Sequence, residues 1–387
     1  MISPESHELP ELVRHLHQQG TCWLPAGLGS RLDWGAALSQ PCEVLSCARL
    51  QRILDHNPGD FTISVEAGTP LADVQAALAE HRQWLALDPP WGEASGSIGG
   101  LVARGLAGGY RQRHMGVRDQ LIGIGLIRAD GVQARAGGKV VKNVAGYDLM
   151  RLLTGSWGSL GLITELTLRT LPLPLQRRGV VVQGPLPALA DLTRWLLGSG
   201  LSPERIDWWN PRLAARAGFS AEPLLLIGLA SVDASTLEAQ AAALGQRSPL
   251  PCHGLDAEAL MALLHRAGSA GPTPAAWLLR LGVAPDQGAT LLAEPTLAAM
   301  EVNLTAGSGL GMAWGSRQSA AEIEALRRRC QALGGHLTVL LQPADANLPA
   351  WEDAPSRPLI EAVKRQFDPK LQLAPGRLPG VASLRAG

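Results

Sequence analysis

The chain has 387 residues, which is long enough for two domains. Of these residues 46% are apolar and 18% charged, a composition typical of a folded protein. Lys plus Arg and Asp plus Glu number 34 each, which argues against nucleic acid or an anionic membrane surface as a partner. No run of about 18 apolar residues occurs, and the N-terminus has no apolar signal core, so we expect a cytoplasmic protein.

Glycine-rich turns separate the predicted elements of the first 175 residues. Gly20 should end the first helix, and Asp130-Gly131 should form the turn of a hairpin. The expected elements, in chain order, are a helix within residues 3–19, a strand at 21–25, a strand at 61–68, a helix after Pro70, a hairpin at 120–136 and a strand at 162–175.

Beyond Pro172 glycine becomes sparser, and strand and helix patterns alternate. An antiparallel sheet covered by helices is the natural solution for such elements, so we predict an α+β fold. Strands are expected at 178–184, 204–210, 223–232, 275–285, 310–316 and 336–343, and helices at 186–198, 233–245, 255–268 and 319–335, with a last helix beginning near residue 359.

The cysteines are five in number and include no CxxC pair; they are Cys22, Cys42, Cys47, Cys252 and Cys330. We expect free thiols in a reducing compartment. Their spacing predicts no metal and no iron–sulfur cluster held by this chain alone.

Two glycine clusters could bring backbone N–H groups against an anion or a flat ring. PAGLGS, residues 25–30, follows a strand and could wrap phosphate oxygens, although an ordinary tight turn is the alternative. GSIGG, residues 96–100, could lie against a ring or a pyrophosphate, or could simply begin a helix. A Rossmann fingerprint fails because PAGLGS lacks the third glycine, and a Walker A motif fails because the chain has no GK[ST].

Six motifs in a fixed order resemble the FAD-binding domain of the vanillyl-alcohol oxidase and p-cresol methylhydroxylase (PCMH) family. They stand at Pro25–Ser30, Val65–Leu71, Gly96–Gly100, Gly116–Gly123, Gly146–Leu149 and Gly155–Glu165. Within the family the chain resembles the FAD-binding subunits of glycolate oxidase-type complexes. That similarity continues through WLLRLGVAP, MAWGSRQ, GGHLTVL and VKRQFDPKLQLAPGRL, and is weakest from about 180 to 270.

The resemblance implies a PCMH-type FAD-binding domain at residues 1–175. It also implies a substrate or partner cap with an antiparallel sheet at 176–345, and a segment at 346–387 that returns to the first domain. FAD would be held noncovalently, because the turn at 25–30 has no His for a covalent link. The implied activity is oxidation of a 2-hydroxy acid, glycolate to glyoxylate, by hydride transfer to the flavin. The implied partners are a larger FAD subunit and an iron–sulfur subunit, which would attach the chain peripherally to the inner membrane.

The family motifs also imply which residues meet the cofactor. Arg113 and Asp119 could instead cap a turn, Tyr147 could only support the flavin wall, and Lys142 could face either the flavin or water. The implied FAD-binding residues are Pro25, Gly27, Gly29, Ser30, Pro90, Gly96, Ser97, Gly99, Gly100, Arg113, Asp119, Gly146, Tyr147, Gly158, Gly161 and Ile163.

Two residues of the second half are candidates for catalysis. Arg280 is a charge on an apolar strand and could bind a substrate carboxylate, or pair with an acid of the chain. His336 could accept the hydroxyl proton, or make a structural hydrogen bond.

The chain departs from the family at several points. Ala374 replaces an Asn, Ser316 replaces a Gly, and the HxGDGxxH segment of the larger glycolate oxidase subunit is absent from the sequence. Two alternatives therefore stay open. One is a self-sufficient FAD-linked oxidoreductase of another alcohol, and the other is a non-catalytic relay or scaffold subunit that contains FAD.

Overall fold

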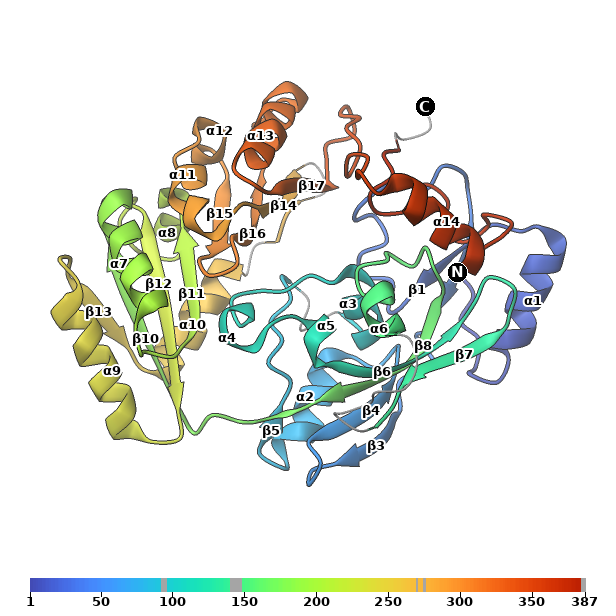
Figure 1. Ribbon diagram of the computed structural model, residues 1–387, viewed down its shortest axis with the longest axis horizontal. Coiled ribbons are helices and arrows are strands. Elements are labelled where there is room, and N and C mark those ends of the chain that lie inside the picture. Colours follow the sequence, from blue (N-terminus) through green and yellow to red (C-terminus); the bar gives the residue numbers. More distant parts are fainter. Residues whose placement is uncertain (92–95, 140–147, 269–270, 274–275, 384–387) are drawn as a thin grey trace. The chain divides into compact units, whose positions relative to one another are not determined.

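The computed structural model describes residues 1–91, 96–139, 148–268, 271–273 and 276–383 (Figure 1). The chain divides into two compact units. The first comprises residues 1–107, 115–173 and 349–387, and the second comprises residues 108–114 and 174–348. The short stretch 108–114 was not expected to belong to the second unit.

The first unit contains a central antiparallel sheet with the strand order β3-β4-β8-β6-β7. Two small sheets, β1-β2 and β5-β9, complete it. Its elements are α1 (Leu9–Gln19), β1 (Trp23–Ala26), β2 (Glu43–Ser46), β3 (Ile53–Asn57), β4 (Thr62–Glu66), α2 (Leu71–Ala79), β5 (Gln83–Trp84), α3 (Ile98–Arg104), α5 (Val117–Gln120), β6 (Leu121–Ile127), β7 (Gln133–Gly137), α6 (Leu149–Leu153), β8 (Leu162–Arg169), β9 (Leu171–Pro172) and α14 (Arg357–Phe367).

The core of this unit forms where helices cover the five-stranded sheet. In β8, Leu166 and Leu168 are fully buried and alternate with less buried polar residues, as a half-buried strand requires. They pack with apolar residues of α2 and α3, including Leu78 and Val102. The predicted helices, strands and hairpin of this region are confirmed, and Gly20 ends α1 in the left-handed conformation.

The C-terminal segment adds to the first unit beside β1. Trp23 donates its backbone N–H to Gln372 O at 3.0 Å, and Ala374 donates to Trp23 O at 2.8 Å. Leu373, between them, is fully buried in a second core with α1 residues such as Leu9. The tail therefore packs against the strand that leads into the PAGLGS turn.

The second unit is built on one antiparallel sheet with the strand order β13-β10-β12-β11-β15-β16-β14-β17. Its elements are α4 (Arg111–His114), β10 (Gln176–Gln183), α7 (Leu186–Gly198), β11 (Pro203–Trp209), α8 (Pro211–Arg216), β12 (Leu224–Ser231), α9 (Ala234–Arg247), β13 (Cys252–Leu255), α10 (Ala257–Gly268), β14 (Trp277–Gly282), η1 (Pro285–Gln287), α11 (Gly288–Leu292), α12 (Pro295–Ala298), β15 (Glu301–Thr305), β16 (Leu310–Gly315), α13 (Ala320–Ala332) and β17 (His336–Leu341).

Strand β11 is buried along its whole length although it carries three charged side chains. Arg177 donates two hydrogen bonds of 3.1 Å to Glu204, and Arg205 Nε donates to Asp207 Oδ2 at 2.8 Å. Pairing of this kind is what allows charges to be buried. The guanidinium groups of Arg177 and Arg205 also lie over the ring of Tyr110 and hold the 108–114 stretch in the unit.

The expectation of five free thiols is wrong for one pair. Cys22 and Cys42 form a disulfide, with Cα atoms 4.8 Å apart, whereas Cys47, Cys252 and Cys330 are free. The sequence missed this pair because the two cysteines are 20 residues apart and meet only when β1 and β2 align in parallel.

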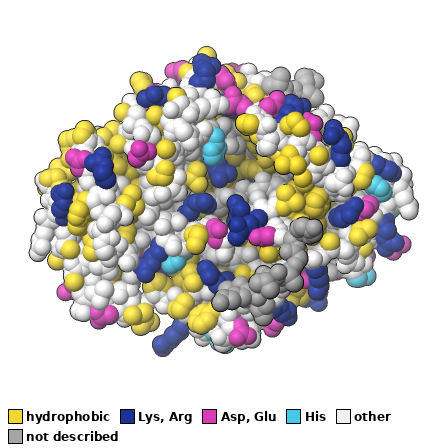
Figure 2. Space-filling view, in the orientation of Figure 1, with side chains coloured by type: hydrophobic (Ala, Val, Ile, Leu, Met, Phe, Trp, Pro, Cys, Tyr) yellow, Lys and Arg dark blue, Asp and Glu magenta, His cyan; other side chains and the backbone are white. Residues whose placement is uncertain are grey.

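In the described ranges, no helix is long and apolar enough to cross a membrane, and no group of three or more His, Cys, Asp or Glu residues could hold a metal ion. On the face drawn in Figure 2, Lys and Arg side chains occur in separate groups among acidic and apolar ones.

Candidate cofactor-binding pocket

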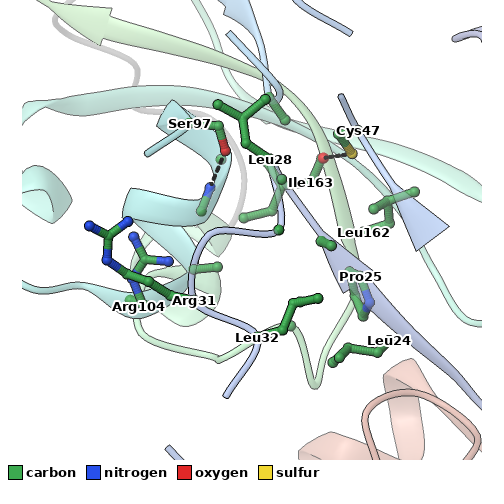
Figure 3. Close-up of a pocket in the computed structure, with 18 of the residues that line it drawn as sticks. Leu24, Pro25, Leu28, Arg31, Leu32, Cys47, Ser97, Arg104, Leu162 and Ile163 are labelled. Atoms are coloured by element: carbon green, nitrogen blue, oxygen red, sulfur yellow. Dashed lines mark hydrogen bonds between the residues drawn. The ribbon is translucent and has the colours of Figure 1, made fainter. Parts of the chain in front are cut away.

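A pocket in the first unit is formed by the turn after β1, the start of α3 and the segment 157–163 (Figure 3). Its lining surrounds about 750 Å³ of space without protein atoms, part of it open to solvent. Ten of the residues predicted to meet FAD line this one pocket, although they come from three separate motifs. They are Pro25, Gly27, Gly29, Ser30, Ser97, Gly99, Gly100, Gly158, Gly161 and Ile163.

Gly27 and Ser97 bring the first two motifs into direct contact. A Cβ atom on Gly27 would lie 2.0 Å from Ser97 Oγ, so no other residue fits without a shift. The same hydroxyl accepts the backbone N–H of Gly100 at 3.2 Å and caps α3. The PAGLGS turn and the GSIGG segment therefore pack against each other as two walls of the pocket.

Other glycines of the motifs are also required by contacts inside the protein. A Cβ on Gly99 would lie 2.7 Å from the Cβ of Ala67, and one on Gly158 would lie 3.1 Å from Pro25 Cγ. Gly158 has φ +73°, a left-handed conformation that favours glycine. The glycine excess therefore serves close packing of the motif segments as well as access for a ligand.

The two walls differ in whether their backbone N–H groups already have an acceptor in the protein. At the start of α3, Ile98 N donates to Thr69 O, Gly99 N to Ala67 O and Gly100 N to Ser97 Oγ. Within the described residues, by contrast, the N–H groups of residues 28–30 in the turn donate to no protein acceptor. The turn can therefore offer a cluster of amide donors to an anion.

Three arginines that sequence reasoning missed also line the pocket: Arg31, Arg104 and Arg377. Burial, and then the charge of Arg31, lowers the pKa of Arg104 to about 10, so it stays charged at neutral pH. Burial lowers the pKa of Arg377, against the opposing effect of Asp33. Arg377 Nη2 donates to Leu32 O, which holds the residues just after the turn. The signal that could have found two of them is their position: Arg31 directly follows PAGLGS, and Arg104 follows GSIGG by four residues.

Cys47 is the one cysteine among the described lining residues. Its thiol donates a weak hydrogen bond to Ile163 O at 3.8 Å. Burial, and then the charge of Glu66, raises the pKa of this thiol to about 12. A thiol that stays protonated is a poor nucleophile, so Cys47 is not suited to a covalent link with a flavin.

The other predicted cofactor residues that the structure describes are not among the residues that line this pocket. Gly96 O accepts the N–H of Leu71, and Asp119 Oδ2 accepts the N–H of Gly116 at 3.1 Å, which is the turn-capping alternative. Arg113 lies in the second unit and donates to Ser202 O at 2.7 Å. Pro90 is half-buried in the loop before residue 92. Gly146, Tyr147 and Lys142 lie outside the described residues.

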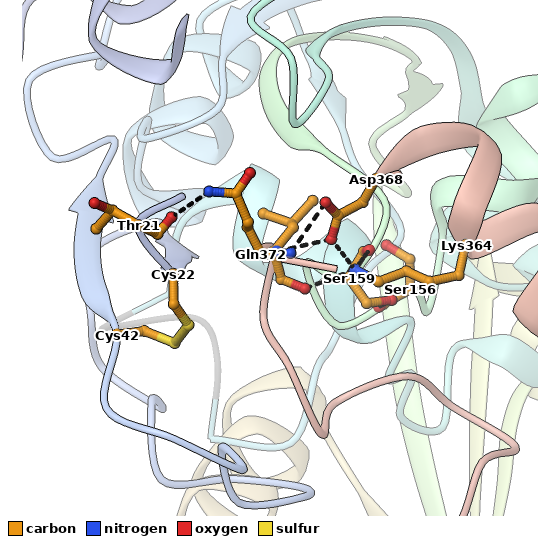
Figure 4. A network of polar contacts seen from close by, with 9 residues as sticks. Thr21, Cys22, Cys42, Ser156, Ser159, Lys364, Asp368 and Gln372 are labelled. Carbon is orange, nitrogen blue, oxygen red and sulfur yellow. Dashed lines mark hydrogen bonds and ion pairs between the residues drawn. A yellow bond between two sulfur atoms is a disulfide. The ribbon is translucent and has the colours of Figure 1, made fainter. Parts of the chain in front are cut away.

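A buried ion pair ties the C-terminal segment to the pocket wall (Figure 4). Lys364 Nζ lies 2.7 Å from Asp368 Oδ2, from Ser159 O and from Leu373 O. Asp368 in turn accepts the N–H groups of Gln372 and Leu373. The network links the segment that contains Gly158 and Gly161 to the tail that pairs with β1.

The two candidate catalytic residues lie near each other in the second unit. Arg280 is half-buried on β14, and its strand pairs with β17 so that Gly282 faces His336. Among the described residues Arg280 has no acidic partner, and burial, followed by the charge of Arg111, lowers its pKa. Desolvation and then the charge of Arg280 lower the pKa of His336, although the residue is exposed at the start of β17.

Comparison with known proteins places these features in a family context. A family model described as FAD binding domain matches residues 2–137. Glycolate oxidase subunit GlcE of Escherichia coli (strain K12) is 40% identical over 196 residues, which cover 50% of this chain and 55% of that protein. Glycolate oxidase subunit GlcD of Bacillus subtilis (strain 168) is 35% identical over 152 residues, covering 39% of this chain and 32% of that protein.

A solved structure of alkyldihydroxyacetonephosphate synthase is similar to almost the whole chain. The TM-score is 0.68 over 97% of this chain and 75% of that one, and the 15% identity means that the likeness shows the fold alone. The match to the E. coli subunit spans about half of that relative's length. Residues 2–137 of this chain thus match an FAD binding domain, and the matched range includes the PAGLGS and GSIGG segments that line the pocket.

Proposed function

We propose that the chain binds FAD noncovalently in this pocket and is the FAD-binding subunit of a glycolate oxidase-type complex that oxidises a 2-hydroxy acid, glycolate to glyoxylate. The observation that carries the proposal is the convergence of three family motifs on one pocket, where Gly27 meets Ser97 and Gly158 meets Pro25. The similarity to the E. coli subunit supports the choice of complex.

The residues of the pocket suit FAD by their chemistry as well as by the order of their motifs in the sequence. The free amides of residues 28–30 can donate to phosphate oxygens, and apolar residues such as Leu24, Leu162 and Ile163 can lie against a ring. When bound, FAD would supply the two-electron acceptor for a hydride from an alcohol carbon. The protonated state of Cys47 supports noncovalent binding.

On the substrate side we propose that Arg280 binds the carboxylate of the hydroxy acid and that His336 accepts its hydroxyl proton. A guanidinium without an acidic partner in the described chain is suited to a carboxylate, which it can bind through two N–H groups. The lowered pKa of His336 keeps its imidazole neutral at pH 7, the form that can accept a proton.

The partners belong to the same proposal. The names of the two bacterial relatives describe separate subunits of glycolate oxidase, which supports a complex of this chain with a larger FAD subunit. An iron–sulfur subunit would carry the electrons onward, since the chain's cysteines show no cluster spacing.

Purification of the full chain, alone and together with the two partner subunits, tests the proposal. We expect a yellow protein from which acid precipitation releases FAD into the supernatant. Glycolate or D-lactate should bleach the flavin of the complex. A chain that takes up no FAD would refute the proposal. A yellow chain that glycolate or D-lactate bleaches without partners would favour a self-sufficient oxidoreductase, and a complex whose activity survives loss of this chain's FAD would favour a scaffold role.

A further inference from the structure

Two arginines, Arg31 and Arg104, lie together at the part of the pocket where its two glycine walls meet. Arg31 directly follows the PAGLGS turn, and Arg104 is the last residue of α3. Figure 3 shows their guanidinium groups side by side, and the charge of Arg31 acts on Arg104 electrostatically. A Cβ on Gly100 would lie 3.6 Å from Arg104 Nη1, which places this guanidinium beside the GSIGG segment.

Neither charge is neutralised by an acid within ion-pair distance in the described part of the chain. Arg104 makes no hydrogen bond or ion pair with a described residue. Arg31 Nη1 donates to Ser30 Oγ at 2.8 Å, and its guanidinium lies 5.2 Å from the ring centroid of Trp34. Asp33 is the nearby acid, and it favours the charged form of Arg31 without forming an ion pair. Two adjacent, partly buried cations are unfavourable by themselves and become favourable when an anion lies between them.

We propose that Arg31 and Arg104 bind the diphosphate of FAD and so position the dinucleotide in the pocket, an inference that rests on the proposed FAD-binding function. The amides of Ile98, Gly99 and Gly100 are already used inside the protein, so this wall must meet phosphate oxygens with other donors. The guanidinium groups provide those donors from the side of α3, while the free amides of residues 28–30 provide them from the turn. Guanidinium groups bind phosphate through paired N–H groups as well as by charge.

The consequence is a specificity for flavins that carry phosphate. Riboflavin has the same ring system as FAD but no phosphate, so it should gain nothing from either arginine. FAD should lose about tenfold in affinity for each guanidinium removed, the scale of a hydrogen bond to a charged group.

The test uses the full chain, freed of flavin in concentrated bromide, and follows rebinding of FAD and of riboflavin by flavin fluorescence. The variants are Arg31→Gln, Arg104→Gln and Arg104→Lys. The matched control is Arg118→Gln, an exposed arginine of α5 in the same unit. Arg31→Gln and Arg104→Gln should weaken FAD binding and leave riboflavin binding unchanged. Arg104→Lys should keep part of the affinity for FAD, because it keeps the charge.

The outcomes separate this inference from the function on which it rests. A wild-type chain that binds no FAD would refute the proposed function. If Arg31→Gln and Arg104→Gln bind FAD as tightly as the wild type and the control Arg118→Gln do, the arginine proposal alone is overturned. Equal losses for FAD and riboflavin would overturn it too, because the arginine would then act on the ring site or on the fold. If a variant does not fold, competition in the wild type decides: inorganic pyrophosphate must displace FAD more strongly than sulfate at equal ionic strength.

Discussion

Lys364 and Ser159, which are 205 residues apart in the sequence, are joined by a hydrogen bond of 2.7 Å from the ammonium group to the backbone oxygen. Ser159 lies between Gly158 and Gly161, which line the pocket, and Lys364 lies on α14 near the end of the chain. Because Lys364 also pairs with Asp368, the C-terminal helix positions one wall of the cofactor pocket. This relationship gives the C-terminal segment a defined role in the first unit.

Replacement of Lys364 by Met should destabilise the first unit by about 3–5 kcal/mol, the usual cost of leaving one partner of a buried ion pair alone. Lys364 is 6% exposed and Asp368 is fully buried, so the carboxylate cannot recover its hydration. We expect a lower urea midpoint and a lower flavin content. Lys370→Met is the matched control, because Lys370 is exposed in the same segment and donates to His17 O alone. An effect of equal size for both variants would contradict the role of the pair.

Replacement of Gly27 by Ala should cost stability and flavin affinity because the new methyl group collides with Ser97 Oγ. Overpacking of this kind costs about 1–3 kcal/mol. The double variant Gly27→Ala with Ser97→Ala removes the oxygen and leaves the Cβ of residue 97 at 3.2 Å, so it should lose less stability than the sum of the two single variants. Ser97→Ala alone loses a helix cap worth about 1 kcal/mol. Gly59→Ala is the control, since its Cβ would come no closer than 3.5 Å to another group. Urea unfolding of the wild type, the two single variants and the double variant would show the coupling between Gly27 and Ser97. Strictly additive losses of stability would exclude a direct clash.

The roles proposed for Arg280 and His336 predict that the rate of the reaction depends on pH. The pKa of His336 is lowered by desolvation and by the charge of Arg280, so the imidazole is neutral above that pKa and protonated below it. If neutral His336 accepts the substrate proton, glycolate oxidation by the complex should fall only at a pH below 6.5, the usual histidine pKa, because the pKa of His336 is lowered. Arg280→Gln removes the neighbouring charge, so the pKa of His336 should rise and the acid limb of the profile should shift to higher pH.

Control measurements separate this effect from a structural one. Arg280→Gln should also raise KM for the hydroxy acid while FAD remains bound, because Arg280 lies in the other unit from the cofactor pocket. His253→Gln, an exposed histidine of β13, should leave the profile unchanged. An acid limb that stays in place in Arg280→Gln would argue against His336 as the proton acceptor.

The disulfide between Cys22 and Cys42 predicts a thiol count. When the chain is unfolded without reductant, alkylation should label the three free cysteines, Cys47, Cys252 and Cys330, and after reduction it should label all five. Cys22→Ser should give four labelled thiols without reductant. Closing a loop of 20 residues should stabilise the first unit by about 3 kcal/mol against the reduced form. Mass spectrometry of the alkylated chain gives the counts, and five labelled thiols before reduction would contradict the bond.

Much of the fold was predictable because local pattern and turn chemistry agree with the final structure. The alternation of Leu166 and Leu168 with polar residues predicted β8, and Gly20 predicted the end of α1. The ordered glycine motifs predicted ten residues that line one pocket, because close approach of segments leaves glycine at fixed places in the sequence.

The rest depended on which surfaces meet in three dimensions. Arg104 and Lys364 look like ordinary helix residues in the sequence, because nothing local tells a guanidinium or ammonium group that faces a pocket from one that faces water. Folding decides it: α3 carries Arg104 to the side of Arg31, and α14 packs Lys364 against Ser159. The sequence by itself determined many of the secondary elements and the order of the flavin motifs. Tertiary structure alone determined which charges lost their water, and loss of water is what makes a charge require a partner or a ligand.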